Sequence, residues 1–401
     1  MTAGWPVHGL DVGALRESGW RPTPFRQFVL KVASRCNLSC DYCYMYHLAD
    51  RGWRSSPRMM SAVVVAKTAD RIAEHAARHD LDQVSVILHG GEPLLAGADR
   101  LTAVVSTVRA ALSPRTRLSA GLQTNGTLLD GPTLDRLVGA DIRIAVSLDG
   151  TADDHDRHRR DASDRGSHAA TVAGLRLLVE EPYRDHFAGL LAVVDVTNDP
   201  VDTYESMLEF RPPTVDFLLP HATWASPPDN RDTHPPPAHG RWLATVFDRW
   251  YDVPLRETRV RLFSEIIHLI LGGNSHSDQV GLSPAATIVV NTDGAVEQID
   301  TLRVAYAGAS STALTVFAND FDESLAHPAV AARQIGLAAL SEECLSCPLV
   351  RVCGGGHYAH RYRPDTGFRN PSVYCADLAY LIRHIGERVR RDVARLRERV
   401  R

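Results

Sequence analysis

Several absences limit what this chain of 401 residues can be. It has no apolar run as long as a membrane span, and its first residues lack the basic and apolar regions of a secretory signal peptide. Both absences favour a cytoplasmic protein, in which cysteines stay reduced and available to metals. The net charge of −4 is too small to draw the chain to nucleic acid or to an anionic membrane. Lysine is nearly absent while arginine is abundant, which we attribute to codon usage.

Cysteine is missing from the long middle of the chain. All seven cysteines fall in two groups, three within residues 36–43 and four within residues 344–375. Structural cysteines are usually spread among buried positions. The grouping therefore indicates that every cysteine is a ligand.

Strand-like and helix-like segments alternate after an N-terminal arm, residues 1–24. Six alternations with short connections predict a parallel sheet, and an open barrel of such strands binds its ligands at their C-terminal ends. We predict an α/β fold, a partial (β/α)6 TIM-like barrel over residues 25–255 and a smaller domain over residues 256–401. The predicted strands are 25–32, 83–88, 118–122, 142–148, 187–196 and 215–219. The predicted helices are 61–78, 98–112, 130–138, 167–179, 201–208 and 242–251, then 262–271 and 377–400, with a strand–turn–strand at 287–296.

The first cysteine group, Cys36, Cys40 and Cys43, follows the first predicted strand with C-x3-C-x2-C spacing. Three thiolates can hold three irons of a cubic iron–sulfur cluster and leave the fourth iron open to a small molecule. A zinc site and unrelated core thiols are the alternatives, although zinc prefers four ligands and the fourth is missing locally. The spacing resembles the radical S-adenosylmethionine (radical SAM) superfamily. That resemblance implies a [4Fe-4S] cluster that binds SAM and cleaves it to a 5′-deoxyadenosyl radical.

The same resemblance assigns a set of SAM-binding residues to the ends of successive strands. Glu92 would accept from the SAM ammonium group, beside glycines that allow a close backbone approach. Ser147 and Arg159 would hold the carboxylate and ribose region, because arginine binds a carboxylate through two donors. Arg160 is adjacent and leaves that choice open, and the histidines nearby are interpreted as loop or surface residues. The full set is Tyr42, Gly90, Gly91, Glu92, Gln123, Asn125, Ser147 and Arg159.

The second cysteine group resembles the SPASM extension of peptide-modifying radical SAM enzymes. That pattern usually has seven cysteines and two auxiliary clusters, but residues 281–302 contain no cysteine, and His357 stands at a cysteine position. We therefore expect a SPASM-type domain with one auxiliary [4Fe-4S] cluster, two clusters in all, and a hydrogen-bonding or packing role for His357. A zinc ribbon is the alternative. The expected ligands of the auxiliary cluster are Cys344, Cys347, Cys353 and Cys375.

Asp300 is the candidate catalytic base. In the sulfatase-maturing relatives, an aspartate at the matching position acts as a base in the substrate pocket, and Asp300 stands there although the cysteine before it is replaced by Ile299. Removing an electron and a proton from a substrate radical needs such a base. The alternative is a solvated turn residue.

Residues 353–378 and 217–221 resemble the FxsB branch of radical SAM/SPASM peptide maturases. This implies a peptide cyclase that joins an aromatic ring carbon to the β-carbon two residues on in a ribosomally made precursor peptide, giving a three-residue cyclophane. An external electron donor is implied as a second partner. The alternatives are a sulfatase-type formylglycine maturase, a thioether-forming enzyme and a non-enzymatic iron–sulfur carrier. The arm of residues 1–24 is too short for an appended leader-binding domain, so we expect leader recognition by a separate protein, the small domain or strand addition.

Overall fold

A computed structural model describes residues 4–229 and 231–400. Within them, ten strands form one sheet in the order β10-β9-β8-β1-β2-β3-β4-β5-β6-β7. Strands β1 to β8 pair in parallel, and β9 and β10 are antiparallel additions at one edge. The strands are β1 (Gln27–Ala33), β2 (Gln83–Gly90), β3 (Arg117–Thr124), β4 (Ile142–Ser147), β5 (Phe187–Val193), β6 (Thr214–Leu218), β7 (Arg259–Val260), β8 (Thr287–Val290), β9 (Ala295–Glu297) and β10 (Ser311–Thr315).

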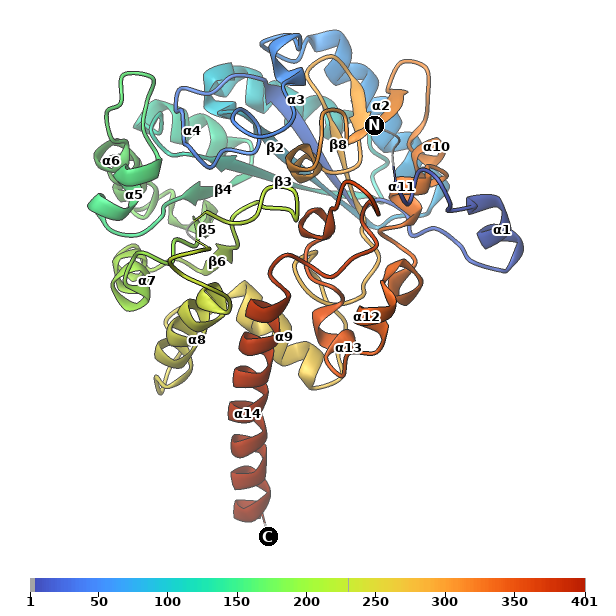
Figure 1. The fold of residues 1–401 in the computed structure, drawn as a ribbon. Coiled ribbons are helices and arrows are strands. Elements are labelled where there is room, and N and C mark those ends of the chain that lie inside the picture. Colours follow the sequence, from blue (N-terminus) through green and yellow to red (C-terminus); the bar gives the residue numbers. More distant parts are fainter. Residues whose placement is uncertain (1–3, 230, 401) are drawn as a thin grey trace.

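Helices cover the outer side of this sheet, and shorter helices build the C-terminal part (Figure 1). The predicted α/β partial barrel is thus confirmed, with six parallel strands each followed by a helix. The helices are α1 (Val12–Glu17), α2 (Ala62–Arg78), α3 (Ala98–Ala111), α4 (Gly131–Gly139), α5 (Ala152–His158), α6 (His168–Leu178), α7 (Pro200–Leu208), α8 (Ala238–Tyr251), α9 (Arg261–Ile270), α10 (Phe321–Leu325), α11 (Pro328–Ala331), α12 (Glu342–Leu345), α13 (Val350–Cys353) and α14 (Cys375–Val400).

Local chemistry explains where several of these elements begin. The Ser61 hydroxyl accepts from the backbone N–H of Val64 at 3.3 Å, which caps α2 as its sequence predicted. Helix α5 was not predicted, since it is short and mostly polar; the Thr151 hydroxyl caps it. Because this segment is polar, its sequence showed no sign of the helix, which lies between the site residues Asp149 and Arg159.

The strand–turn–strand at residues 287–296 is confirmed as β8 and β9 but lies elsewhere than its sequence position suggested. Strand β8 pairs in parallel with β1 and extends the barrel sheet, so the sheet continues beyond the predicted boundary at 255/256. This pairing buries apolar side chains, because Ile288, Val289 and Val290 are fully buried beside β1. The C-terminal part is thus built on the free edge of the first strand.

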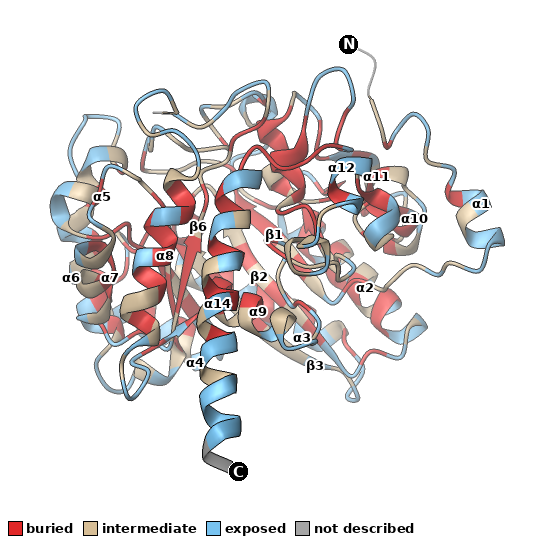
Figure 2. Ribbon diagram, turned by 60° about the horizontal axis from the view of Figure 1, so that its bottom comes forward, coloured by how far each residue is buried: buried red, intermediate tan, exposed pale blue. Residues whose placement is uncertain are grey.

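Helix α14 leaves the body of the molecule at its C-terminal end (Figure 1). Its first half packs on α8 and α9, and its far half is exposed (Figure 2). The packed positions recur at the spacing of an amphipathic helix; they are Leu378, Leu381, Ile382, Ile385 and Val389. Among the described helices, none combines the length and apolar character needed to cross a bilayer.

Candidate active site

The first cysteine group lies in the loop that leaves β1, pressed against the end of β2. Gly91 donates its backbone N–H to the Ala33 carbonyl at 2.9 Å. A Cβ at Gly91 would lie 2.3 Å from the Arg35 carbonyl oxygen, and one at Gly90 would lie 2.1 Å from that of Ala33. Both glycines are therefore required by the approach of the cysteine loop itself. The sequence predicted a close approach to a ligand at these positions.

Glu92 joins the ends of β2 and β3. Its buried carboxylate accepts from the Leu94 N–H at 2.9 Å, the Asn125 N–H at 2.8 Å and the Thr124 hydroxyl at 2.7 Å. Burial raises the pKa of Glu92 to about 7, and those three hydrogen bonds act in the opposite direction. Two carboxylate oxygens offer about four acceptor positions, so one stays available to an ammonium group.

Arg159 lies inside the site, beside the cysteine loop. Its guanidinium binds Asp149 through two bonds, Nε to Oδ2 at 2.7 Å and a terminal nitrogen to Oδ1 at 3.2 Å, and it stacks 5.5 Å from the Tyr42 ring. The Tyr42 hydroxyl donates to the same carboxylate. Arg160 instead pairs with exposed Asp164, away from the site. The geometry thus places Arg159 rather than Arg160 in the site, a choice that the sequence left open. It also adds Asp149, whose only signal in the sequence was its position after β4.

The remaining residues predicted to bind SAM form a polar row along the ends of β3 and β4. Gln123 donates to the Ser147 hydroxyl at 3.0 Å. The Asn125 amide donates to the Asn37 side chain at 2.9 Å and lies 3.8 Å from the Cys36 sulfur. The predicted SAM-binding set is therefore gathered around the cysteine loop, at the carboxyl edge of the sheet.

The three thiols of this loop suit an iron–sulfur cluster. All are free, and burial raises the pKa of Cys36 to about 12 and that of Cys40 to about 11, with further increases from the neighbouring thiols. A coordinated metal reverses this effect, because a metal-bound thiol loses its proton. Burial also raises the pKa of Cys43, against the backbone hydrogen bonds from Met45 and Tyr46 and the charges of Arg159 and Lys31, which lower it. Three sulfur donors with two cations beside them match the charge of a thiolate-bound cluster.

Asp300 forms a buried ion pair with Lys31 of β1. The two side chains are 9% and 2% exposed, and the Tyr44 hydroxyl donates to the same Asp300 oxygen at 3.0 Å. Burial favours the neutral acid, but the Lys31 charge, the nearby His89 and the hydrogen bonds from Lys31 and Tyr44 together hold the pKa of Asp300 well below its usual range. Asp300 is therefore ionised, and it is not a solvated turn residue. Lys31, one of the chain's two lysines, was missed; a charge between Leu30 and Val32 of a buried strand was the available signal.

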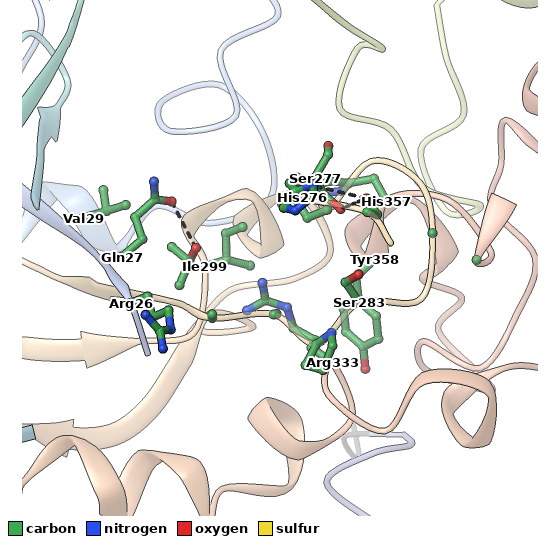
Figure 3. Close-up of a pocket in the computed structure, with 18 of the residues that line it drawn as sticks. Arg26, Gln27, Val29, His276, Ser277, Ser283, Ile299, Arg333, His357 and Tyr358 are labelled. Carbon is green, nitrogen blue, oxygen red and sulfur yellow. Dashed lines mark hydrogen bonds and ion pairs between the residues drawn. The ribbon is translucent and has the colours of Figure 1, made fainter. Parts of the chain in front are cut away.

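A cavity of about 770 Å³ opens beside this ion pair. It runs between the start of β1 and β2 and the C-terminal part, and His89 and Asp300 line it. Figure 3 shows Gln27 and Ile299 on one side of the cavity, with His357 and Tyr358 across from them. The candidate base thus lines a space of the size that holds small-molecule ligands, although little of its side chain is exposed.

The second cysteine group converges although its members come from three helices. Cys344 lies in α12, Cys353 ends α13 and Cys375 begins α14. Burial raises the pKa of Cys353 to about 11, and Cys375 and Cys344 raise it further. The charge of Cys347 acts on Cys375 in the same way. The four thiols, all free, can therefore meet at one metal centre.

Arg361, which the sequence did not single out, holds the glycine loop after Cys353. Its guanidinium donates to the carbonyls of Gly354 at 2.7 Å and Gly356 at 2.6 Å. A Cβ at Gly354, where φ is +60°, would lie 1.7 Å from the Gly281 carbonyl oxygen. Only glycine lets the loop cross there.

The histidines near the first site differ from their interpretation in part. His158 is partly buried and pairs with the carboxylates of Asp41 and Asp195. His155 is buried and hydrogen-bonded to Ser167 at 3.0 Å. Burial lowers the pKa of His155 to about 3, so it is a neutral core residue. These contacts give both histidines structural roles.

The comparisons with known proteins agree with this geometry. The model of the radical SAM superfamily matches residues 30–207, from β1 through α7. Over 356 residues the chain is 24% identical to a cysteine-type anaerobic sulfatase-maturating enzyme of Clostridium perfringens, covering 88% of this chain and 94% of that protein. A serine-type anaerobic sulfatase-maturating enzyme of Bacteroides thetaiotaomicron is 24% identical over 261 residues, 61% of each chain.

Two groups of solved structures share the fold. The structure of native anSMEcpe with bound AdoMet has a TM-score of 0.79 and 22% identity, covering 90% of this chain and 97% of that one. Streptococcus suis SuiB bound to precursor peptide SuiA has a TM-score of 0.59 and 15% identity, covering 90% and 78%. These likenesses confirm the predicted fold. The superfamily match and the curated sulfatase-maturating relatives confirm the predicted class, a radical SAM enzyme. The resemblance to the FxsB branch stays a prediction.

Proposed function

We propose that this radical SAM enzyme cross-links a ribosomally made precursor peptide, joining an aromatic ring carbon to a side-chain β-carbon in a three-residue cyclophane. The observation that carries the proposal is the ionised Asp300 carboxylate, which lines a cavity of about 770 Å³ and pairs with Lys31, a cation that also acts on Cys43 of the cysteine loop. A space of that size accepts a short peptide segment with its aromatic ring. An ionised carboxylate there can remove the proton that the ring must lose after the new bond forms.

The cofactors would be held by the residues described above. Cys36, Cys40 and Cys43 would bind the first [4Fe-4S] cluster, and the polar row from Glu92 to Arg159 would bind SAM. When bound, cluster and SAM supply the carbon-centred radical that abstracts hydrogen. The four C-terminal cysteines would hold the auxiliary [4Fe-4S] cluster. With four protein ligands such a centre suits electron transfer.

The chain's own residues have distinct roles in this scheme. Asp149 and Tyr42 hold Arg159 in one orientation, so its charge stays beside Cys40. Lys31 keeps Asp300 ionised and Tyr44 orients it, so the carboxylate is ready to accept a proton. Burial at the cavity wall limits the access of water to that oxygen.

A second function is favoured by the comparisons. Sulfatase-maturating enzymes match up to 88% of the chain, which supports oxidation of a cysteine or serine side chain to formylglycine. A peptide substrate is common to both functions, as it is for SuiB with its precursor peptide. An external electron donor and a cytoplasmic location belong to either proposal, because the free cysteines require a reducing compartment.

The test uses the anaerobically reconstituted enzyme with SAM, a chemical reductant and two peptides. One is a synthetic precursor-type peptide with an aromatic residue two positions before a residue that has a β-hydrogen, and the other carries a sulfatase-type cysteine or serine. Tandem mass spectrometry of a cyclophane shows loss of two hydrogens and no fragmentation across three residues that include an aromatic one. Formylglycine instead reacts with a hydrazide and leaves fragmentation intact. That result, with the precursor unmodified, would replace the first function by the second.

The role of Asp300 has its own test. Asp300→Asn should still release 5′-deoxyadenosine but form cross-linked peptide roughly 100-fold more slowly, the usual effect of losing a general base. Asp293→Asn is the matched control, because Asp293 is an exposed residue of the turn between β8 and β9. Equal product rates in both variants would remove Asp300 from the mechanism.

A further inference from the structure

Three histidines that are far apart in the sequence meet beside the cavity. His221 follows β6, and His357 and His360 follow α13. One nitrogen of each lies within 4.8 Å of the others. Zinc ligands at 2.0–2.1 Å in a tetrahedral arrangement are roughly 3.4 Å apart, so a small inward movement of the three rings would complete such a site.

Within the described structure, most ring nitrogens of this cluster lack hydrogen-bond partners. The Nδ1 atoms of His221 and His357 and both ring nitrogens of His360 are buried without a partner among the described residues. His360 is only 3% exposed. Leaving several polar atoms buried and unpaired is costly, and a native structure usually satisfies them with water, an ion or protein.

A second histidine cluster in the same chain shows the contrast. His75 and His79 share Asp322, at 2.6 Å and 2.9 Å, and the other His75 nitrogen accepts from the Phe25 N–H at 3.0 Å. Three of the four ring nitrogens of that cluster therefore have protein partners, and the cluster ties α2 to α10. The cluster at His221, His357 and His360 has no comparable set of partners in the part of the chain that the structure describes.

A carboxylate stands behind the unsatisfied cluster. Asp278 Oδ2 lies 3.4 Å from His357 Nε2, while Nδ1 of the same ring is unpaired within the described structure. Metal-binding histidines usually give their second nitrogen to such a carboxylate, which fixes the ring and strengthens the ligand. Burial lowers the pKa of His221 to about 3 and that of His360 well below its usual range, so both are in the neutral form that binds metals.

We propose that His221, His357 and His360 bind one divalent metal ion of the zinc class, with Asp278 as the outer carboxylate. Imidazole nitrogens suit this class of ion. Three protein ligands leave a fourth position open, as in catalytic zinc sites. His357 and Asp278 line the cavity, which provides the entry path.

The proposed ion lies next to the candidate catalytic group. The His221 ring packs edge-to-face against Tyr44 with 4.8 Å between ring centroids, and Tyr44 donates to Asp300. A metal here would therefore stand one side chain away from the proposed base. It would be a third metal centre, and its existence does not depend on which peptide the enzyme modifies.

The test is zinc binding by the protein with its iron–sulfur clusters in place. The protein is incubated anaerobically with Zn²⁺, desalted and analysed for zinc per chain and by zinc K-edge absorption, which is blind to iron. We expect one zinc per chain with only nitrogen and oxygen ligands at ~2.0 Å and no sulfur at ~2.3 Å. His357→Gln should lose this zinc, whereas His79→Gln, in the satisfied cluster, should keep it.

Asp278→Asn gives a second measurement if His357→Gln folds poorly. Loss of an outer carboxylate typically weakens metal binding 10–100-fold, so the zinc affinity of this variant should fall by about that factor. The proposal is overturned if no zinc remains after desalting, if sulfur appears among the zinc ligands, or if His357→Gln and Asp278→Asn bind zinc as tightly as the wild type.

Discussion

Replacing Lys31 with methionine tests the buried ion pair at the candidate active site. The side chains of Lys31 and Asp300 are 2% and 9% exposed, so solvent screens their interaction little. Removing one partner of a buried pair lowers the free energy of unfolding by about 3–5 kcal/mol. Tyr44 would still donate to the carboxylate, so we expect a loss at the lower end of this range, about 3 kcal/mol.

The variant should also change how stability depends on pH. In the wild type, burial raises the pKa of Asp300, but Lys31, His89 and the hydrogen bond from Tyr44 together lower it by more. Its contribution to stability is therefore present above the unfolded-state pKa of about 3.9 and is lost only at lower pH. Without Lys31, burial raises the folded-state pKa instead. The free energy of unfolding of Lys31→Met should then fall as pH rises above ~3.9, by up to ~1.4 kcal/mol per pH unit.

Anaerobic urea unfolding followed by circular dichroism, between about pH 5 and pH 8, measures both effects. Lys67→Met is the matched control, because Lys67 is the only other lysine and makes no ion pair among the described residues. Lys31→Met with Asp300→Asn removes both charges and should recover part of the loss. The reasoning is refuted if Lys31→Met unfolds at the wild-type urea concentration with a flat pH profile.

Three further predictions concern other parts of the molecule. Gly91→Ala should lower iron per reconstituted chain by about one cluster, since its Cβ would meet backbone at 2.3 Å; Gly131→Ala, with open space, should not. Arg361→Met should release the glycine loop after Cys353 and lower the iron content per chain by one auxiliary cluster, while the spectrum of the SAM-binding cluster is retained. Burial lowers the pKa of His75, so the free energy of unfolding of the wild type should decrease as the pH falls below about 6.5. The decrease should be smaller in His75→Gln.

Local sequence patterns were sufficient for most of the barrel and for the first site. Apolar alternation predicted β1 to β6 within a few residues, because each strand has two buried neighbours. Residues that follow successive parallel strands meet at one edge whatever their loops do. This is why the positions of Cys36, Glu92, Asn125 and Ser147 along the chain were enough to place them together.

Sequence spacing predicted only part of the second cysteine group as a common metal site. The short interval from Cys344 to Cys353 indicates a common centre, but Cys375 joins it through the packing of α14 on α8 and α9. Nothing local predicted β8 beside β1, since any apolar strand could cover that edge. Tertiary packing made that choice.

The sequence by itself determined the enzyme class, the α/β barrel and the candidate ligands, because these follow from short spacings and periodic burial. Only the tertiary structure decided which distant charges and rings meet. Lys31 and Asp300 are 269 positions apart, and their pairing depends on β8 closing onto β1. His221 reaches His357 and His360 for the same reason: contacts across a curved sheet depend on strand order and side-chain direction, which no local pattern records.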